Sequence, residues 1–299
     1  MRIVELPQIQ KLLVYSEIIG RMREALIAHS RGECDTPMPM HLDFAGGGEA
    51  HMKSSYRRGG RHFALKIAAT FPRSANGMML LSSAETGEPV AFLADRGHLT
   101  DARTAAVAAL VAQELGRHDR TLGILGTGIQ ARLQAEWHAQ VLPLERIVLW
   151  GRDAARVEEC RRDIAKFAEV SVAAIPAEVA HETRLIVTCT ASRAPLLRAG
   201  HIQAGTHISA VGADSPGKQE LDPAILSHAS LVLVDSRRQC EKLGELQHAP
   251  EVVGRAVELG ELLGGEKAQA GGLRYSVCDF TGLGVEDLYI AEYCWEKLA

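Results

Sequence analysis

From Arg120 onward, short apolar runs alternate with stretches of helical spacing. A run beginning at Arg120 leads into a glycine turn and a helix that reaches Arg132, and Asp153–Ala168 has helical spacing. Further strand-like runs follow along the chain: Arg146–Trp150, Val170–Ala174, Leu185–Thr190, His207–Ala213 and Leu231–Asp235. Strands that alternate with helices predict a parallel, doubly wound sheet.

The chain before this region is less regular. A helix is predicted over Ser16–Ser30, followed by strand candidates separated by glycines. These candidates are Met38–Phe44, His51–Tyr56, His62–Ala68, Gly77–Ser82 and Pro89–Asp95. Together they predict a mixed, curved sheet.

Two further helices indicate how the parts connect. The alanine-rich stretch Thr100–Leu115 predicts a helix that links the two parts, with Thr100 as its N-cap and Asp101 in its first turn. Leu283–Leu298 has the pattern of an amphipathic helix that returns to the first part. We therefore expect an α/β protein with two domains: residues 1–117 with 279–299, and residues 118–278. Ligand sites favour the cleft between such domains.

The glycine turn has the spacing of a dinucleotide-binding loop. Gly126 allows the tight turn, Gly128 lets the backbone approach a pyrophosphate, and Ala131 lets the helix lie close to the strand. The helix then presents free N–H groups to the phosphates. The cofactor candidates in this loop are Gly126, Thr127, Gly128, Ile129 and Gln130. The motif alone also fits a strand–turn–helix that binds nothing.

The residues after the second strand bear on the choice of nucleotide. Arg152 is placed to meet a ribose 2′-phosphate, whereas Asp153 lies late for the usual contact with a ribose hydroxyl. The sequence therefore favours NADPH over NADH, although an arginine after a strand is often a solvated surface charge. Thr190 and Val211, in the predicted strands that follow, are further cofactor candidates.

Composition narrows the possible partners. The 299 residues are 46% hydrophobic and carry a net charge of −4, which gives no electrostatic reason to expect nucleic acid or an anionic membrane. The N-terminus lacks the apolar core of a signal peptide, and no apolar run approaches the roughly 20 residues of a membrane helix. The six cysteines have no CxxC spacing and the twelve histidines form no HExxH pair. We expect reduced thiols, a cytoplasmic location and no metal site.

Polar residues interrupt several apolar segments. Asp214 follows a predicted buried strand, where a carboxylate can exchange protons or can simply cap the turn before Ser215. Lys66 interrupts an apolar strand and either serves a site or points outward by alternation. Arg103 and Thr104, in the first turns of the linking helix, could hold a carboxylate, or could mark an exposed helix start.

These segments resemble the ornithine cyclodeaminase/μ-crystallin family of NAD(P)-dependent enzymes over nearly the whole chain. The matching pieces are FALK (63–66), LTDARTAA (99–106), GTGIQA (126–131), VGADSPGKQEL (211–221) and SVCDFTGLGVEDL (276–288). Their order and distances fit the family as well. The resemblance implies a Rossmann domain, a substrate domain that pairs two subunits into a homodimer, and an active site in the cleft.

The resemblance also implies roles for individual residues. Lys66 matches the family lysine that contacts the carboxylate or imine region of the substrate, Arg103 with Thr104 matches the carboxylate-binding arginine, and Asp214 matches the acid/base aspartate. Family members that bind simple amino acids carry a further arginine roughly where this chain has residues 38–41. No arginine occurs between Arg31 and Arg57, although Lys53 could replace that cation. This segment resembles the branch with iminosuccinate reductases and ectoine-utilisation proteins.

Three functions follow as hypotheses. The first is NAD(P)H-dependent reduction of an α-imino acid, a ketimine or an iminosuccinate-like compound, or the reverse dehydrogenation. In it Arg103 and Lys66 hold the carboxylate, and Asp214 handles the proton of the nitrogen. The second is a cyclodeaminase that releases ammonia with bound NAD, against which Arg152 and the missing arginine argue. The third is a μ-crystallin-like binding protein without catalysis, which would have little need for all three polar residues.

Overall fold

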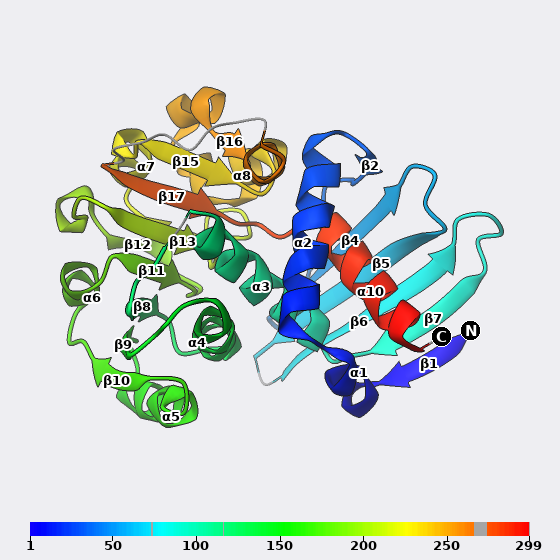
Figure 1. The fold of residues 1–299 in the computed structure, drawn as a ribbon, viewed down its shortest axis with the longest axis horizontal. Coiled ribbons are helices and arrows are strands. Elements are labelled where there is room, and N and C mark those ends of the chain that lie inside the picture. The colour runs from blue at the N-terminus through cyan, green and yellow to red at the C-terminus, as the bar shows by residue number, and fades with distance from the viewer. Residues whose placement is uncertain (73, 116, 266–273, 299) are drawn as a thin grey trace. The chain divides into compact units, whose positions relative to one another are not determined.

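The computed structural model describes residues 1–299 except 73, 116, 266–273 and 299 (Figure 1). The chain divides into two compact units. Residues 1–107 and 283–299 form one, which we call the N-terminal unit, and residues 108–282 form the other, the central unit. The division falls within helix α3 (His98–Glu114). Each unit is described by itself below.

The N-terminal unit is built on a seven-stranded sheet with the order β1-β7-β6-β5-β4-β2, and β3 pairs with β4 beside β2. The strands are β1 (Arg2–Glu5), β2 (Cys34–Asp35), β3 (Met40–Asp43), β4 (Glu49–Arg57), β5 (His62–Phe71), β6 (Ser74–Ser83) and β7 (Pro89–Ala94). All pairs are antiparallel except β1 with β7. The prediction of a mixed sheet from five strand candidates is confirmed, and β1 and β2 were not predicted.

Helices cover one face of this sheet. They include α1 (Leu6–Leu12), α2 (Tyr15–Ser30) and α10 (Gly284–Leu298), and α10 packs on α2, β4, β5 and β6 (Figure 1). A Cβ atom at Gly284 would lie 2.4 Å from the backbone oxygen of Ser54, so the start of α10 requires glycine to approach the sheet. The helix predicted at Leu283–Leu298 therefore returns to this unit as expected. Its first half, 284–291, is buried on all sides rather than amphipathic.

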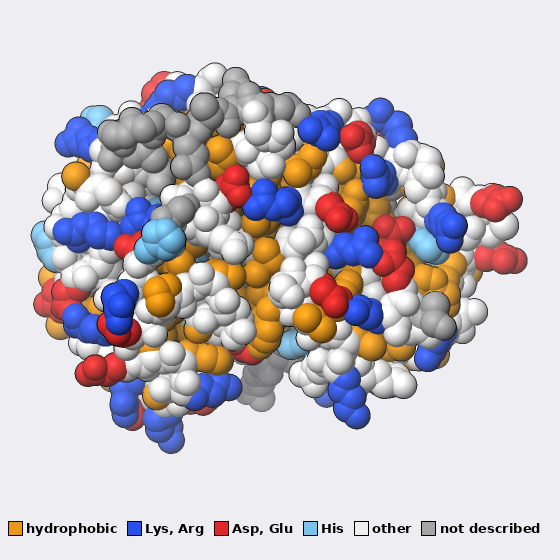
Figure 2. Space-filling view, in the orientation of Figure 1, with side chains coloured by type: hydrophobic (Ala, Val, Ile, Leu, Met, Phe, Trp, Pro, Cys, Tyr) orange, Lys and Arg blue, Asp and Glu red, His pale blue; other side chains and the backbone are white. Residues whose placement is uncertain are grey.

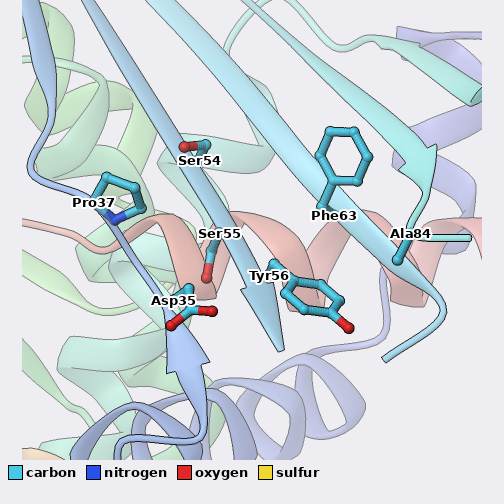
Figure 3. Close-up of a pocket in the computed structure, with 7 residues that line it drawn as sticks. All are labelled: Asp35, Pro37, Ser54, Ser55, Tyr56, Phe63 and Ala84. Atoms are coloured by element: carbon cyan, nitrogen blue, oxygen red, sulfur yellow. The ribbon is translucent and has the colours of Figure 1, made fainter. Parts of the chain in front are cut away.

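The two faces of the sheet differ in burial because side chains alternate along each strand. The face under α10, which we call the covered face, carries buried residues: Lys53, Ser55, Ala64, Lys66, Met79 and Leu81. The opposite face, the open face, carries partly exposed apolar residues: Met52, Phe63, Leu65, Ile67, Met78 and Leu80. A hollow of about 430 Å³ lies at its β2 end, lined by Asp35, Pro37, Ser54, Ser55, Tyr56, Phe63 and Ala84 (Figure 3).

The start of α3 differs from the prediction. The helix begins at His98, so Thr100 lies inside its first turn and does not act as the N-cap. The side chain of Asp95 instead accepts the backbone N–H of Leu99 at 2.8 Å. The prediction failed because Asp95 precedes the alanine-rich stretch, across a Gly97 turn with positive φ.

The central unit contains an eight-stranded parallel sheet with the order β10-β9-β8-β11-β13-β17-β15-β16. Its strands are β8 (Thr121–Leu125), β9 (Arg146–Trp150), β10 (Glu169–Val172), β11 (Leu185–Thr188), β13 (Thr206–Ala210), β15 (Leu231–Val234), β16 (Val257–Glu258) and β17 (Tyr275–Asp279). The chain builds outward from β8 in both directions, which is the doubly wound arrangement. The predicted α/β fold class is confirmed.

The remaining elements of the central unit connect these strands. The helices are α4 (Ile129–Val141), α5 (Ala154–Ile164), α6 (Pro176–Glu182), α7 (Pro223–His228), α8 (Arg237–Leu243) and α9 (Leu259–Leu263), with short 3₁₀ turns η1 (Ala199–His201), η2 (Glu245–His248) and η3 (Pro250–Arg255). A separate pair joins β12 (Arg193–Leu197) to β14 (Gln219–Leu221). Strand β17 was not predicted, because Ser276 and Asp279 interrupt its apolar pattern although all five residues are buried.

No helix in the described ranges is long and apolar enough to cross a membrane. On the face shown in Figure 2, basic and acidic side chains are interspersed, and they form no continuous basic patch there. This view agrees with the small net charge of −4.

Candidate functional site

Three neighbouring strands of the central unit end at one edge of the sheet. Leu125 of β8 pairs with Thr188 of β11, and Thr188 pairs with Ala210 of β13. The segments that follow these three residues contain most of the predicted cofactor residues and Asp214. In open α/β sheets, ligands bind outside the carboxyl ends of the strands.

The glycine turn after β8 leaves its backbone accessible. Gly126 has φ +135° and donates its N–H to the carbonyl of Trp150 at 2.9 Å. A Cβ atom there would lie 2.7 Å from the carbonyl oxygen of Cys189, so no other residue fits. Gly128 is the N-cap of α4, and a Cβ atom built on it meets nothing within 4 Å. With Ala131 buried against the sheet, this geometry fits the phosphates of a dinucleotide at the start of α4.

Arg132 fixes the turn and was not predicted as a site residue. Its guanidinium donates to the carbonyl oxygens of Thr127 and Gly128, at 2.7 and 3.2 Å, and pairs with Asp163 at 2.6 Å. The carbonyls of the turn are thereby occupied by protein. Ile129 is 54% exposed, so the first turn of α4 reaches the surface of this unit.

The residues after β9 have different roles. Asp153 is the N-cap of α5, because its carboxylate accepts the N–H groups of Ala155 and Arg156 at 2.9 and 3.1 Å. A carboxylate held in this way is less available to a ribose hydroxyl. Arg152, one residue earlier, is exposed.

Thr190 and Val211 were predicted inside strands, but they lie just past the ends of β11 and β13, and both are held by protein groups. Glu220 accepts the N–H and the hydroxyl of Thr190 at 2.6 and 2.7 Å, and the N–H of Gly212 at 2.9 Å. Val211 donates its N–H to Thr188 at 2.8 Å. A Cβ atom at Gly212 would lie 2.5 Å from the Glu220 carboxylate, so this contact requires glycine.

Glu220 is the first of four buried carboxylates that we call the carboxylate chain. Glu245 accepts the N–H groups of Glu220 and Leu221, at 2.7 and 3.3 Å. Asp279, at the end of β17, accepts those of Glu245 and Leu246, at 2.9 and 3.0 Å. Asp235, at the end of β15, accepts those of Thr281 and Gly282. Glu220 and Asp235 thus fix loops that follow strands, whereas Glu245 fixes strand β14 and Asp279 fixes the turn η2.

Burial has a cost for these acids. It raises the pKa of Glu220 and that of Asp279 to about 7, although the backbone N–H donors act in the opposite direction. Burial, followed by the charge of Asp279, also raises the pKa of Glu245. The segments at the strand ends are therefore held by carboxyl groups whose ionised form is destabilised by burial.

Asp214 lies in the segment after β13. Its Oδ1 accepts from Lys218 Nζ at 2.6 Å and from the Ser215 hydroxyl at 3.0 Å, and its side chain is 46% exposed. Gln247 holds the turn that follows, since it accepts the N–H of Gly217 at 2.8 Å. The carboxylate of Asp214 thus faces a lysine and stays partly accessible.

In the N-terminal unit, Lys66 and Arg103 converge on α10. Arg103 pairs with Asp287 at 3.1 Å and with Glu286 at 2.9 Å, and Lys66 Nζ lies 4.0 Å from Asp287. Lys66 is 2% exposed and Arg103 3%, so the alternatives of an outward-pointing lysine and an exposed helix start are wrong. Lys53 pairs directly with Lys66 across β4 and β5, and it is also buried.

Thr104 is half-buried beside Arg103. Its hydroxyl donates to the carbonyl of Thr100 at 2.8 Å, within the helix. Donation to a ligand would require this hydroxyl to rotate.

Sequence reasoning gave no role to Glu286 and Asp287. They lie in α10, where two adjacent acids stand among buried apolar residues. Two buried acids in a mostly apolar helix predict cationic partners, because a buried charge is rarely left unpaired. That pattern could have linked α10 to Lys66 and Arg103.

Comparison with known proteins shows the family of this chain. Residues 3–299 match the profile described as the ornithine cyclodeaminase/mu-crystallin family. The chain belongs to this family. It is 37% identical to an uncharacterized cyclodeaminase of Sinorhizobium fredii (strain NBRC 101917 / NGR234), over 84% of this chain and 80% of that protein. It is 31% identical to a Delta(1)-pyrroline-2-carboxylate reductase of Bacillus cereus (strain ZK / E33L), over 99% and 96%.

A solved structure agrees with the fold of this family member. It is an archaeal alanine dehydrogenase dimer with bound NAD, with a TM-score of 0.89, 26% identity, and coverage of 99% of this chain and 95% of that one. The predicted family is confirmed. The names of these relatives support the prediction of an enzyme that acts on an imine or an amino acid.

The carboxylate chain makes a prediction about stability and pH. Because burial raises the pKa of Glu220 from 4.5 to about 7, the folded state binds the proton more tightly than the unfolded chain. The stabilising contribution is full below pH 4.5 and is lost as the pH rises through about 7. Between about pH 5 and about pH 8, the free energy of unfolding measured in urea should fall in Glu220→Gln by less than in wild type. The difference between the two decreases should be roughly 1–3 kcal/mol.

The comparison is with wild type, because burial lowers the pKa of His138 and of His207, and these groups titrate in the opposite sense. Glu241→Gln, on the exposed side of α8, is the control and should keep the wild-type pH dependence. Parallel curves for wild type and Glu220→Gln would contradict the role of this carboxyl.

Proposed function

We propose that this protein reduces an α-imino acid to the amino acid with a reduced nicotinamide cofactor, or catalyses the reverse dehydrogenation. One observation carries the proposal: Lys66 and Arg103 are buried together on carboxylates of α10, with Lys53 paired to Lys66 across the strands. In this group of five side chains, three are cations and two, Glu286 and Asp287, are acids. Buried positive charge of this kind favours a ligand with a carboxylate.

The substrate carboxylate would bind the guanidinium of Arg103 and the ammonium of Lys66. Asp287 orients both cations, because each of them lies within 4.0 Å of its carboxylate. Arginine suits this role because its planar fork can donate two parallel hydrogen bonds to a carboxylate. Lys53 would supply the cation that the missing arginine provides in other members of the family.

Asp214 would handle the proton of the substrate nitrogen. When bound, the reduced nicotinamide supplies a hydride to the imine carbon, and the nitrogen takes one proton to give the amine. The carboxylate of Asp214 can stabilise a positively charged nitrogen and exchange that proton directly or through water. Lys218, at 2.6 Å, orients the carboxylate.

The nucleotide would bind at the strand ends of the central unit, through Gly126, Thr127, Gly128, Ile129 and Gln130, with Thr190 and Val211 on the neighbouring strands. We propose a preference for NADPH over NADH. The exposed Arg152 is free of any capping role, whereas the neighbouring Asp153 caps α5.

Gly128 gives a sharp test of nucleotide binding. Because its Cβ position is open in the protein, Gly128→Ala should fold with an unchanged melting temperature and yet bind NADH and NADPH roughly tenfold more weakly. Gly200→Ala, also open, is the control and should bind as wild type. In the same titrations Arg152→Gln should weaken NADPH more than NADH. Unchanged affinity in Gly128→Ala would exclude this location for the phosphates.

The reaction itself is tested by absorbance of the reduced nicotinamide, with NADPH or NADH and a panel of cyclic ketimines, iminosuccinate, and keto acids with ammonia or methylamine. We expect stoichiometric loss of reduced cofactor with one class of imine. Asp214→Asn should lower kcat about 100-fold or more and keep nucleotide affinity. Asp222→Asn is the matched control, since asparagine also caps helices and α7 should remain intact.

A second candidate is a cyclodeaminase, which the name of the Sinorhizobium fredii relative favours. No net loss of reduced cofactor across the panel, together with ammonia release from ornithine or lysine in the presence of NAD, would select it. Full activity of Asp214→Asn would remove Asp214 from either scheme.

We also propose that the protein is a homodimer, paired through the open face of the N-terminal sheet, and that it is cytoplasmic. A face with Phe63, Leu65, Ile67, Met78 and Leu80 partly exposed is typical of an interface. Ile67→Glu should halve the mass measured by light scattering, whereas Val172→Glu, at a 50% exposed position of β10, should leave it unchanged. A monomeric wild type would contradict the homodimer.

A further inference from the structure

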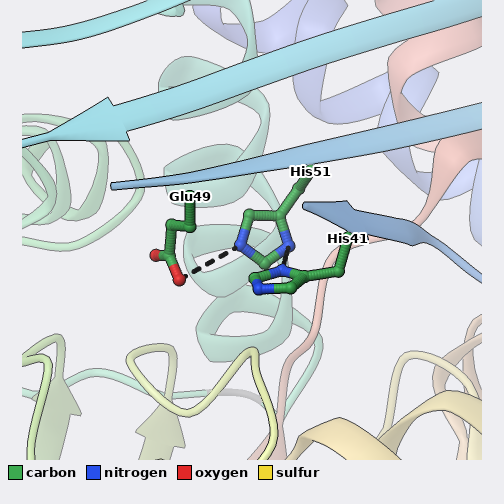
Figure 4. A group of neighbouring side chains, drawn as sticks. All are labelled: His41, Glu49 and His51. Atoms are coloured by element: carbon green, nitrogen blue, oxygen red, sulfur yellow. Dashed lines mark hydrogen bonds and ion pairs between the residues drawn. The ribbon is translucent and has the colours of Figure 1, made fainter. Parts of the chain in front are cut away.

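Two histidine rings face each other on the hairpin of β3 and β4. His41 and His51 are directly paired across the strands, and their Nδ1 atoms lie 3.4 Å apart (Figure 4). The ring centroids are 4.5 Å apart with the planes at 66°. Both side chains are on the face that carries Lys53, because His51 precedes Lys53 by two positions in β4.

A carboxylate lies beside the other nitrogen of each ring. His41 Nε2 is 2.9 Å from Asp43, and His51 Nε2 is 3.6 Å from Glu49. Asp43 and Glu49 are themselves the next pair of the same face along the two strands. The four side chains therefore form two histidine–carboxylate pairs that meet at the two Nδ1 atoms.

The hydrogen-bonded pair of His41 and Asp43 has the arrangement of a histidine that binds a metal ion. Such a histidine usually donates its second ring N–H to a carboxylate, which fixes the ring and the tautomer. In the tautomers that carry the proton on Nε2, His41 donates to Asp43, His51 faces Glu49 at the longer ion-pair distance of 3.6 Å, and the two Nδ1 atoms turn lone pairs towards each other. A cation between them converts that repulsion into attraction.

The spacing fits one class of ion. Zn–N bonds of about 2.0–2.1 Å at a tetrahedral angle place two ligand nitrogens about 3.3–3.4 Å apart. The Nδ1 atoms are separated by 3.4 Å, and ligand atoms of His41, Glu49 and His51 all lie within 4.8 Å of one another. Imidazole nitrogen is also a preferred ligand of Zn²⁺, Cu²⁺ and Ni²⁺.

We propose that His41 and His51 form a site for a divalent transition-metal ion of the Zn²⁺ class, bound through the two Nδ1 atoms and water. Asp43 and Glu49 hold the rings and balance the double charge of the ion. From the sequence we expected no metal site, because the chain has no HExxH pair. The two histidines of this site are ten residues apart and meet only through the hairpin. The site is independent of the proposed reaction, although an occupied site would add positive charge to the face that carries Lys53.

Zinc binding tests the proposal without substrate or nucleotide. The full-length protein, freed of any polyhistidine tag and treated with a chelator, is titrated with ZnSO₄ by isothermal calorimetry. We expect one tight site per chain and affinity at least tenfold lower in both His41→Asn and His51→Asn. The control is His181→Asn, which removes one ring of another histidine pair whose centroids are 6.5 Å apart, and it should bind zinc as wild type.

Thermal unfolding without zinc shows whether each variant is folded. Wild type without a stoichiometric site would overturn the proposal, as would zinc binding that both His41→Asn and His51→Asn retain. Co²⁺ absorption adds a second readout, since the visible bands of the bound ion should vanish in both variants and persist in His181→Asn. Because these readouts do not involve turnover, an inactive enzyme would leave the zinc result unaffected.

Discussion

Buried carboxylates that accept backbone N–H groups hold the carboxyl ends of the parallel strands in the central unit. A buried charge without partners would be destabilising by several kcal/mol, and hydrogen bonds to a charged acceptor each recover about 1.5–3 kcal/mol. Glu220, Glu245, Asp279 and Asp235 therefore each require a neighbouring loop, strand or turn to bring N–H groups to them. The loop with Asp214 is held on both sides by this requirement, through Gly212 on Glu220 and through the β14 strand on Glu245.

The N-terminal unit also contains buried charges that need partners, but there the charges are positive. Its buried cations, Lys66 and Arg103, are held by acids of α10, and Arg103 is 184 positions from Asp287 in the sequence. Removing one member of such a group leaves a buried charge unpaired and is strongly destabilising, by roughly 3–5 kcal/mol. The same pairing positions cations for an anionic ligand, so the stability of this unit and its proposed binding function depend on the same contacts.

The sequence predicted the elements that have a clear local pattern. The strand from Arg146 to Trp150, the glycine turn at Gly126 and the helix ending at Ser30 were predicted almost to the residue, because periodicity and turn chemistry are local properties. Long-range pairing was less accessible. Strand β17 has polar residues that only the parallel sheet can satisfy, and Asp279 finds its donors in η2. The capping role of Asp95 and the facing rings of His41 and His51 likewise depend on turns whose geometry the spacing does not reveal.

The position of α10 has a consequence for synthesis on the ribosome. Domains generally fold as units, the N-terminal one first, as the chain emerges. Here the first 107 residues emerge with Lys66 and Arg103, which are buried in the folded protein. Their partners Glu286 and Asp287 are translated nearly last. Strand β17, which lies between β13 and β15, is also late. Both units must therefore wait in incomplete form until the end of translation, and a truncated chain would expose cations without counter-charges together with an unfilled sheet, features by which quality control can recognise it.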